Sequence, residues 1–270
     1  AKYLISRWPT KFIKFYDDEF ALKLDDWLRE FSERWPKEIG LPFHCLLRAD
    51  IVSREPEILV LLKKAGVKSV MMSVESGNDY VRNNLFKRHM SKDAIRQAFK
   101  KCRELDILTF SLAILGIPVS KKEEIEFNLP DSSKRDIESL DFNLEIRSTL
   151  AEYPILLPFP GTEIGEYCQK NGFFDGNLDI FTVSYQSKSS MACFTPKEKI
   201  LQQNLFMLGS ILQLFAGSKN NFIRILVTPL RWLVVNCLIK LPFSKFYVIF
   251  YVLAVNYLYQ AKLYRHDAFS

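Results

Sequence analysis

The stretch Val67-Lys68-Ser69-Val70-Met71-Met72-Ser73-Val74-Glu75-Ser76-Gly77 decides the fold that this sequence predicts. The residues up to Glu75 predict a largely apolar strand. This strand ends at the carboxylate of Glu75, and a turn that contains Gly77 follows it. Other strand-like runs along the chain also close in polar, proline or glycine residues, and helical stretches separate them. These closing segments are Phe15–Phe20, Leu47–Asp50, Leu115–Pro118 and Pro158–Thr162.

The alternation of short apolar runs with amphipathic helices predicts a parallel sheet and an α/β fold class. We expect helices over about Glu19–Trp35, before a C-cap at Gly66, after the N-cap Ser91, and across 121–140, where Pro130 interrupts. The strands that we expect are Phe12–Tyr16, Phe43–Arg48, Val67–Glu75, Ile107–Gly116 and one within Phe142–Leu157.

The strand and helix order is that of a partial (β/α) TIM-like barrel, expected over residues 1–195, with a helical extension over residues 196–270. In a parallel barrel the carboxyl ends of the strands open on one face, where binding and catalytic groups lie. We therefore expect Asp17, Arg48 and Glu75 to converge with Gly116 on one shared site.

Asp17 and Asp18 place two carboxylates at a strand end, where they can accept hydrogen bonds from an ammonium group. Alternatively, one of them caps the following helix. Arg48 can bind a carboxylate with both prongs of its guanidinium group, or it forms a structural ion pair with Asp50 or Asp18. His44, two residues deeper than Leu46 on the same strand, is expected to be a core histidine.

Glu75 is a carboxylate at a strand end that can hold ribose hydroxyls or an amine; the alternative is a capping role around the turn Ser76-Gly77. The segment Gly116-Ile117-Pro118 offers backbone amide and carbonyl groups against which a flat base can lie, or it is simply a turn. Pro158–Thr162 is interpreted as a rigid structural turn in which Thr162 caps a helix.

Composition limits the class and the cellular setting. The chain has 270 residues, of which 48% are hydrophobic and 25% charged, as is typical of a globular protein. Its five cysteines are scattered, and no pair has the spacing of a zinc or iron–sulfur site. This odd, scattered set argues against a secreted disulfide framework and favours a reducing, cytoplasmic location. The cysteines are Cys45, Cys102, Cys168, Cys193 and Cys237.

The net charge of +6 is unevenly distributed. The segment from Lys199 to His266 contains eight Lys or Arg residues and no Asp or Glu, whereas the rest of the chain carries 29 basic and 31 acidic residues. Such asymmetry indicates a partner-facing or membrane-facing region and does not indicate nucleic-acid binding.

Aromatic residues are interleaved with the basic ones in this segment. Its longest apolar run, Phe246–Val255, is shorter than the ~20 residues of a membrane span, and we expect Pro229 and Pro242 to divide the segment into short helices. An anionic membrane surface is therefore one candidate partner, with a peripheral location on the inner face of the membrane. The alternative is that these helices pack on the barrel or on another domain.

Taken together, the closing segments resemble those of the radical S-adenosylmethionine superfamily, in the branch whose members often carry an N-terminal cobalamin-binding domain. Phe15–Phe20 is similar to the aspartate segment after the second barrel strand of that family, and Arg48–Asp50 to the segment after the third. Val74–Gly77, Leu115–Pro118 and Pro158–Thr162 are similar to the segments after later strands.

The resemblance implies that the strand ends hold S-adenosylmethionine against a [4Fe-4S] cluster. Asp17 and Asp18 would contact the methionyl amine. The carboxylate and the ribose would be surrounded by Arg48, Glu75 and Ser76. The adenine would lie near Gly116, Ile117 and Pro118. It also implies an enzyme that generates a 5′-deoxyadenosyl radical, with cobalamin-dependent methyl transfer as one outcome. Its partners would be an electron donor such as a flavodoxin or ferredoxin and an organic substrate, which is lipid-like if the membrane interpretation holds.

The sequence also departs from the family pattern. The three-cysteine cluster motif of the family precedes the aspartate segment, whereas no cysteine precedes Phe12 here. The simplest account is a truncated piece that does not cleave S-adenosylmethionine by itself. In addition, Asp106 stands where a glycine is usual, and Val119–Lys122 replaces a glycine and an acidic residue. No catalytic residue and no metal ligand is assigned.

Two other classes of function stay open. The chain could be a different barrel enzyme in which Asp17, Asp18 and Glu75 bind a hard metal ion such as magnesium. It could also be a non-catalytic, membrane-associated domain that has kept the fold and lost the cluster.

Overall fold

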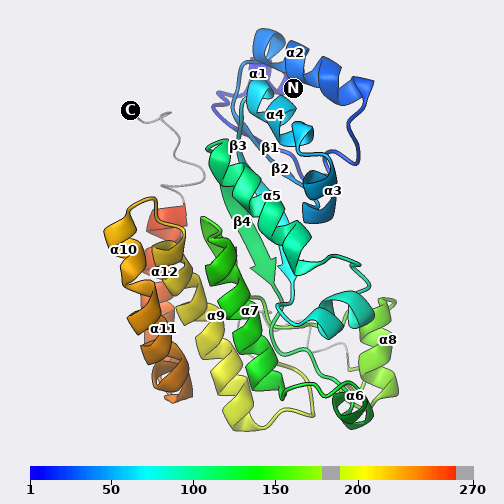
Figure 1. The fold of residues 1–270 in the computed structure, drawn as a ribbon, viewed down its shortest axis with the longest axis vertical. Coiled ribbons are helices and arrows are strands. Elements are labelled where there is room, and N and C mark those ends of the chain that lie inside the picture. Colours follow the sequence, from blue (N-terminus) through cyan, green and yellow to red (C-terminus); the bar gives the residue numbers. More distant parts are fainter. Residues whose placement is uncertain (178–188, 260–270) are drawn as a thin grey trace. The chain divides into compact units, whose positions relative to one another are not determined.

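The computed structural model describes residues 1–177 and 189–259 of the chain. Its framework is a five-stranded sheet with the strand order β1-β2-β3-β4-β5 (Figure 1). β1 pairs in parallel with β2, and β2 with β3. This confirms the predicted α/β fold with the strand order of a partial barrel. The strands are β1 (Ile13–Lys14), β2 (Phe43–Leu46), β3 (Val67–Glu75), β4 (Leu108–Ala113) and β5 (Leu150–Glu152).

The chain divides into two compact units, one with residues 1–73 and 90–111 and the other with residues 74–89 and 112–255. The helices of the first unit are α1 (Lys2–Arg7), α2 (Asp26–Glu38), α3 (Ala49–Arg54), α4 (Glu57–Ala65) and α5 (Lys92–Glu104). The second unit contains the π-helix η1 (Val81–Leu85), α6 (Lys121–Glu126), α7 (Ser132–Ile146), α8 (Glu163–Lys170), α9 (Pro196–Ala216), α10 (Asn221–Ile225), α11 (Val227–Asn236) and the short η3 (Leu238–Lys240), and α12 (Ser244–Tyr259) begins in it.

A half-buried aromatic cluster of the first unit lies at the start of the sheet. Phe15 and Phe20 lie 4.8 Å apart between ring centroids, and both rings contact Phe31 of α2 and Phe43 of β2. Such ring pairs stabilise a fold beyond the area that they bury. Phe20 therefore belongs to a loop that folds back onto the sheet, and the prediction that a helix starts at about Glu19 was wrong.

Most other predicted elements agree with the structure. β3 covers the predicted residues, Gly66 ends α4 in a left-handed conformation, and the Ser91 hydroxyl caps α5 by accepting a hydrogen bond from the Ala94 amide at 3.1 Å. Pro130 separates α6 from α7, as its missing amide hydrogen requires. The helix α7 continues to Ile146, however, so the strand expected within 142–157 is confined to β5.

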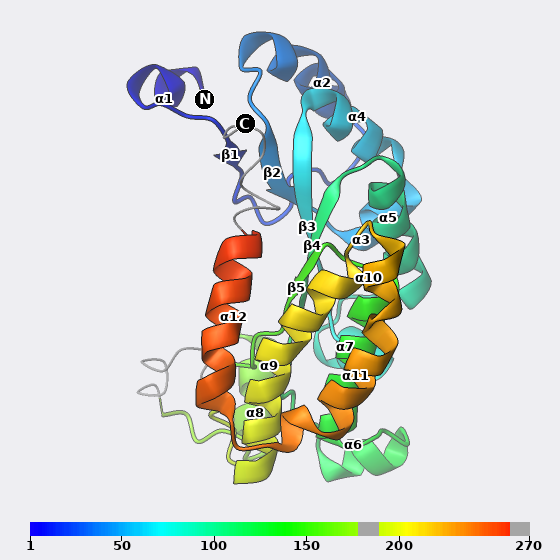
Figure 2. The same ribbon diagram turned by 90° about the vertical axis from the view of Figure 1, so that its left-hand side faces the viewer.

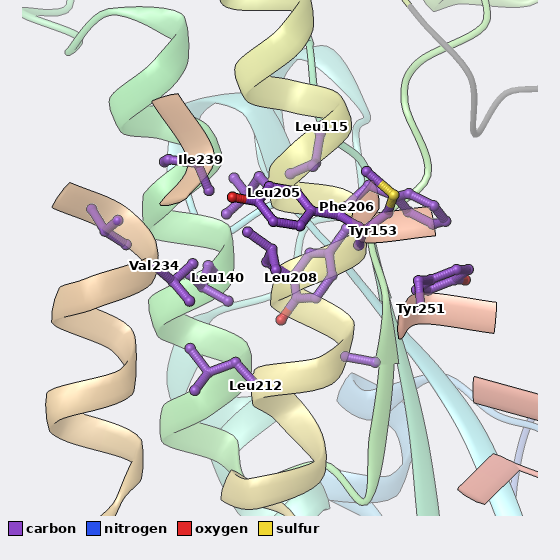
Figure 3. Close-up of a cluster of buried hydrophobic side chains, with 14 of the residues drawn as sticks. Leu115, Leu140, Tyr153, Leu205, Phe206, Leu208, Leu212, Val234, Ile239 and Tyr251 are labelled. Carbon is purple, nitrogen blue, oxygen red and sulfur yellow. The ribbon is translucent and has the colours of Figure 1, made fainter. Parts of the chain in front are cut away.

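The core of the second unit forms around α9, which lies between α11 and α12 in Figure 2 and packs on α7 and β5. Leu205 and Leu140 are fully buried there, and Tyr153 packs beside them (Figure 3). The predicted boundary at residue 195 coincides with Thr195, which caps α9. Whether it is a domain boundary stays a prediction.

The C-terminal segment differs from its prediction at one proline. Pro229 lies in the first turn of α11, where its missing amide hydrogen costs no helical hydrogen bond, so α10, α11 and η3 follow one another almost without a break. Asn221–Lys240 is one helical run of 20 residues with a mean hydropathy of 1.7, long and apolar enough to cross a membrane. The prediction of short helices was therefore wrong at Pro229, whereas Pro242 does separate this run from α12.

Leu205→Ala should destabilise the protein by about 2–5 kcal/mol, because it deletes fully buried methyl groups and leaves a cavity beside α9. The matched control Leu253→Ala makes the same chemical change on the exposed side of α12 and should stay within about 0.5 kcal/mol of the parent protein. Urea unfolding followed by circular dichroism measures both. Equal effects of the two variants would contradict the core as described.

Candidate functional site

The loop that carries Asp17 and Asp18 is anchored at both ends. The Phe15 amide donates to the His44 carbonyl and the Phe20 amide to the Leu46 carbonyl, each at 2.9 Å. The two phenylalanines are thus fixed on β2, and the residues between them project from the end of β1. This explains why the aspartates stand between two aromatic residues in the sequence.

Asp17 and Asp18 are both exposed and form no hydrogen bond or ion pair with the described residues. The alternative that one of them caps the next helix is wrong, because Asp25 caps α2 by accepting a hydrogen bond from the Leu28 amide at 3.0 Å. Two carboxylates without a structural task are therefore available to a cationic ligand.

Arg48 lies at the N-cap of α3 and joins two of the predicted strand ends. Its Nε donates to Asp50 Oδ1 at 3.0 Å and lies 3.6 Å from Glu19 Oε1, so the guanidinium group connects the aspartate segment to the end of β2. The structural ion pair with Asp50 that was considered above is therefore present. The first unit thus brings together the segment of Asp17 and Asp18 and the segment of Arg48.

Glu75 ends β3 with a left-handed backbone, at φ +61°. Its buried carboxylate accepts a hydrogen bond from Arg88, whose Nη2 lies 2.5 Å from Glu75 Oε1. Sequence reasoning missed Arg88, since nothing in its neighbourhood marks it. In the structure, the feature that marks Arg88 is the backbone conformation on either side of it. Lys87 and His89 both have a positive φ, which is unusual for residues other than glycine.

The turn Ser76-Gly77 is packed tightly against α7. A Cβ at Gly77 would lie 2.2 Å from the Glu138 carbonyl oxygen, and the Gly77 amide donates to Ser139 Oγ at 2.9 Å. Glycine is thus required here for close approach and not, as the sequence suggested, to free the turn. The fully buried Arg82 of η1, also missed from the sequence, donates from Nη1 to the Ser76 carbonyl at 2.9 Å.

Gly116 has a left-handed conformation, at φ +66°, and its amide donates to Asp136 Oδ1 at 3.0 Å. Asp136 is buried in α7, and its other carboxylate oxygen has no partner among the described residues. Burial raises the pKa of Asp136 to about 7, although the hydrogen bond from Gly116 acts in the opposite direction. A backbone amide of the predicted base-binding segment is therefore held by a carboxyl group that titrates near neutrality.

The strand ends of Glu75 and Gly116 are neighbours. The Ile114 amide donates to the Glu75 carbonyl at 2.8 Å, and Leu115 forms a parallel bridge with Ile155. The second unit therefore brings together Glu75, Ser76 and the segment Gly116-Ile117-Pro118, with the side chain of Ile117 buried in a core cluster of this unit.

The segment after Pro118, where the sequence departs from the family pattern, is fixed by Glu123. Its carboxylate accepts hydrogen bonds from Tyr80 at 2.7 Å and Tyr167 at 2.5 Å, and it completes a capping box with Ser120. Burial raises the pKa of Glu123, but the hydrogen bonds from Ser120, Tyr167 and Tyr80 outweigh burial and lower the pKa overall. Glu123 therefore fixes the start of the short helix α6.

A cavity of about 450 Å³ lies at the ends of β4 and β5 in the second unit. Leu112 of β4 and Ile114, two residues further along the chain, both line the cavity. Glu152 is the one ionisable side chain in the lining. The residues that surround it are Phe86, Leu112, Ile114, Glu152, Pro154, Ile155, Leu156, Leu157, Phe159, Thr162 and Ile164. Thr162 also caps α8, as predicted, by accepting a hydrogen bond from the Gly165 amide.

No three His, Cys, Asp or Glu side chains in residues 1–177 and 189–259 are grouped closely enough to hold a metal ion. The magnesium-type site considered for Asp17, Asp18 and Glu75 therefore has no support in the structure. His44 is a core residue, as predicted: its Nδ1 lies 2.8 Å from Ser69 Oγ, and burial lowers its pKa to about 4.

Comparisons with known proteins support the family resemblance. Residues 1–128 match the model of the Radical SAM superfamily. The chain is 25% identical over 175 residues to cytidylyl-2-hydroxyethylphosphonate methyltransferase of Streptomyces wedmorensis, covering 63% of this chain and 32% of that protein. It is 24% identical over 161 residues to an uncharacterised methyltransferase of Pyrococcus horikoshii, covering 60% and 32%. The chain thus spans about a third of the length of the curated relatives that it matches.

Among solved structures, the chain is similar to the radical S-adenosylmethionine methyltransferase TsrM of Kitasatospora setae, determined with cobalamin and a [4Fe-4S] cluster bound. The sequence identity is 20% and the TM-score 0.45, and the match covers 59% of this chain and 29% of the other.

Asp25→Ala should cost about 1 kcal/mol of stability, because it removes the cap of α2. The matched variant Asp18→Ala should change stability by less than about 0.5 kcal/mol, because the Asp18 carboxylate has no structural partner among the described residues. Thermal unfolding distinguishes them. A larger loss for Asp18→Ala would assign that carboxylate a structural role.

Asp136 should make the protein less stable as the pH rises from about 4 to about 7. The folded pKa lies above the unfolded value of 3.8, so in this window the folded state holds a proton that the unfolded state has released, and stability falls with pH. Asp136→Asn keeps an oxygen for the Gly116 amide and should be more stable than the parent above pH 7, by on the order of 1–3 kcal/mol. Urea midpoints between pH 4 and pH 8 measure this; parallel profiles of the two proteins would contradict it.

Proposed function

We propose that this chain, which matches the Radical SAM superfamily model over residues 1–128, forms the S-adenosylmethionine-binding barrel of an enzyme that transfers a methyl group. The observation that carries the proposal is the ordered set of polar strand ends on a parallel sheet. The names of the relatives support the methyl-transfer class, and because the chain spans about a third of their length, the activity of a whole enzyme stays a proposal.

The chemistry of the strand ends suits S-adenosylmethionine, which has an ammonium group, a carboxylate, a ribose and an adenine ring. The unpartnered carboxylates of Asp17 and Asp18 fit the ammonium group, and Arg48 fits the carboxylate, although Asp50 competes for it. In the second unit, Glu75 fits the ribose hydroxyls, with Ser76 in the same turn, and the backbone of Gly116-Ile117-Pro118 fits the adenine edge. When bound, this cofactor supplies either an adenosyl radical or a methyl group.

Arg88 has a positioning role in this proposal. Its guanidinium group pairs with the Glu75 carboxylate, with Nη2 2.5 Å from Oε1, and so restricts the movement of that carboxylate. A ribose hydroxyl can donate to the free lone pairs of that carboxylate while Arg88 keeps it in place.

The apolar cavity suits the apolar part of an organic substrate. Apolar walls take up the apolar surface of a ligand by burial. Glu152 and Thr162 are the polar side chains of the lining. We therefore propose a largely apolar substrate.

The side chains present do not fit a [4Fe-4S] cluster. Such a cluster needs neighbouring thiolates, whereas no three cysteines among the described residues are grouped, and burial raises the pKa of Cys102 and of Cys168 to about 12. We derive no step through the cluster. Cobalamin and a flavodoxin- or ferredoxin-type electron donor stay candidates on the family resemblance.

Anaerobic reconstitution of this chain with iron and sulfide should give no [4Fe-4S] absorption near 400 nm, because no three of its cysteines are neighbours. Stoichiometric iron and sulfide in the purified protein would contradict this. Cys193→Ser and Cys237→Ser, which change the two exposed thiols, control for iron bound nonspecifically at the surface.

Calorimetric titration of the chain with S-adenosylmethionine tests the proposed function. We expect binding, and we expect the double variant Asp17→Asn, Asp18→Asn to weaken it at least ~10-fold, because it removes charge-assisted hydrogen bonds to the ammonium group. The matched control Asp93→Asn changes an exposed aspartate of α5 and should bind like the parent. Absence of binding by the parent protein would overturn the proposal, and unchanged binding by the double variant would remove the aspartates from the site.

A further inference from the structure

The helices α10, α11 and α12 expose an apolar face that is unusual for a soluble domain. Phe222 is 82% exposed, Trp232 60%, Ile249 56% and Leu253 63%. Scattered exposed apolar side chains are normal, but this many of them within three successive helices indicate a binding surface. We name it the α10–α12 face. Its further large apolar members are Ile225, Leu226, Leu233, Phe243, Phe246, Val248, Phe250 and Val252.

The same helices have a second, fully packed side. Val234, Val235 and Ile239 are buried against α9, as are Tyr247 and Tyr251 of α12 (Figure 3). The buried Asn204 of α9 also donates from Nδ2 to the Ile239 carbonyl at 3.0 Å and to the Leu241 carbonyl at 2.8 Å. The helices are therefore held on the domain through one side, and the α10–α12 face is left over after this core has formed.

The segment that carries this face is basic. From Lys199 to His266 the sequence has no acidic residue, and an acidic partner that reaches it from outside is Asp141 of α7, which pairs with Arg231. Lys240 of η3 and Lys245 of α12 are exposed, and Arg224 lies in α10. A partner that covers the face must be apolar at its centre and negative at its rim, which is the chemistry of an anionic lipid bilayer at the boundary between acyl chains and headgroups.

The packing favours a helix layer that lies on the bilayer over one that crosses it. The run Asn221–Lys240 is long enough to span, and 11% of its most apolar window is buried inside the protein. Near its middle, however, Arg231 forms a two-pronged ion pair with Asp141 of α7, with Nη2 2.6 Å from Oδ2. Lipid can therefore reach only the outer side of this run without separating it from α7 and α9.

We propose that the α10–α12 face seats this protein on an anionic bilayer as a peripheral membrane protein. The exposed aromatic and aliphatic side chains enter the boundary layer of one leaflet, and the lysines beside them contact the headgroups. This inference is independent of the proposed function, because it uses no residue of the strand-end site.

Flotation with vesicles tests the proposal. The protein should float with vesicles of phosphatidylglycerol and phosphatidylcholine and at least 10-fold less with vesicles of phosphatidylcholine alone, and binding should fall as salt is raised. Ile249→Glu should lower binding at least 10-fold, because it places a carboxylate in the face. The matched control Ile125→Glu makes the same change on α6, at a side chain that is 81% exposed, and should bind like the parent.

Brominated lipids give a second readout. The fluorescence of Trp232 is the difference in fluorescence between the parent protein and Trp232→Phe. We expect brominated lipids to quench this fluorescence more than that of the tryptophans in the first unit. Absence of binding to both vesicle types would overturn the proposal. If the protein self-associates without binding lipid, and Ile249→Glu abolishes this self-association, the face binds a second copy of the chain and the proposal is overturned. Equal, salt-independent binding to both vesicle types would overturn the role of charge.

Discussion

The turn Glu75-Ser76-Gly77 is the constraint on which the candidate site of the second unit depends. Its backbone is held from three directions: by the Ile114 amide, by the buried guanidinium of Arg82, and by Ser139 of α7. These contacts over-determine the turn, so Glu75 keeps a left-handed backbone that a residue with a side chain rarely adopts. The direction of its carboxylate is thereby fixed before any ligand arrives.

The carboxylates at the strand ends differ between the two units in burial and in the contacts that they make. Glu75 is buried and already paired with Arg88, so it is a rigid acceptor. Asp17 and Asp18 project from a loop whose ends are held on β2 by the backbone amides of Phe15 and Phe20, and the two carboxylates have no partner among the described residues.

Sequence reasoning succeeded where the signal is local. β3 could be predicted because a largely apolar run lies between Gly66 and Gly77. The caps Ser91 and Thr162 could be predicted because capping needs only a few neighbouring residues. It failed where a contact between residues far apart in the sequence determines the local structure. Phe20 continues the helical spacing of α2 but packs on Phe15, and Arg88 becomes a site residue only through its ion pair with Glu75. The convergence of the strand-end residues of the two units stays a prediction.

The close packing of α9 has a practical consequence for protein engineering. The Gln202 side chain lies against Gly116, with its atoms 3.1 Å from where a Cβ would be, and Gln213 donates from Nε2 to the Ser148 carbonyl at 2.7 Å, just before β5. The helix thus serves as the back wall of the strand ends that carry the candidate site. A gene shortened after residue 195 would remove this wall, and the adjoining strands would lose their register together with their cover. Fusion partners and affinity tags therefore belong at the ends of the chain and not at the junction that the composition suggests.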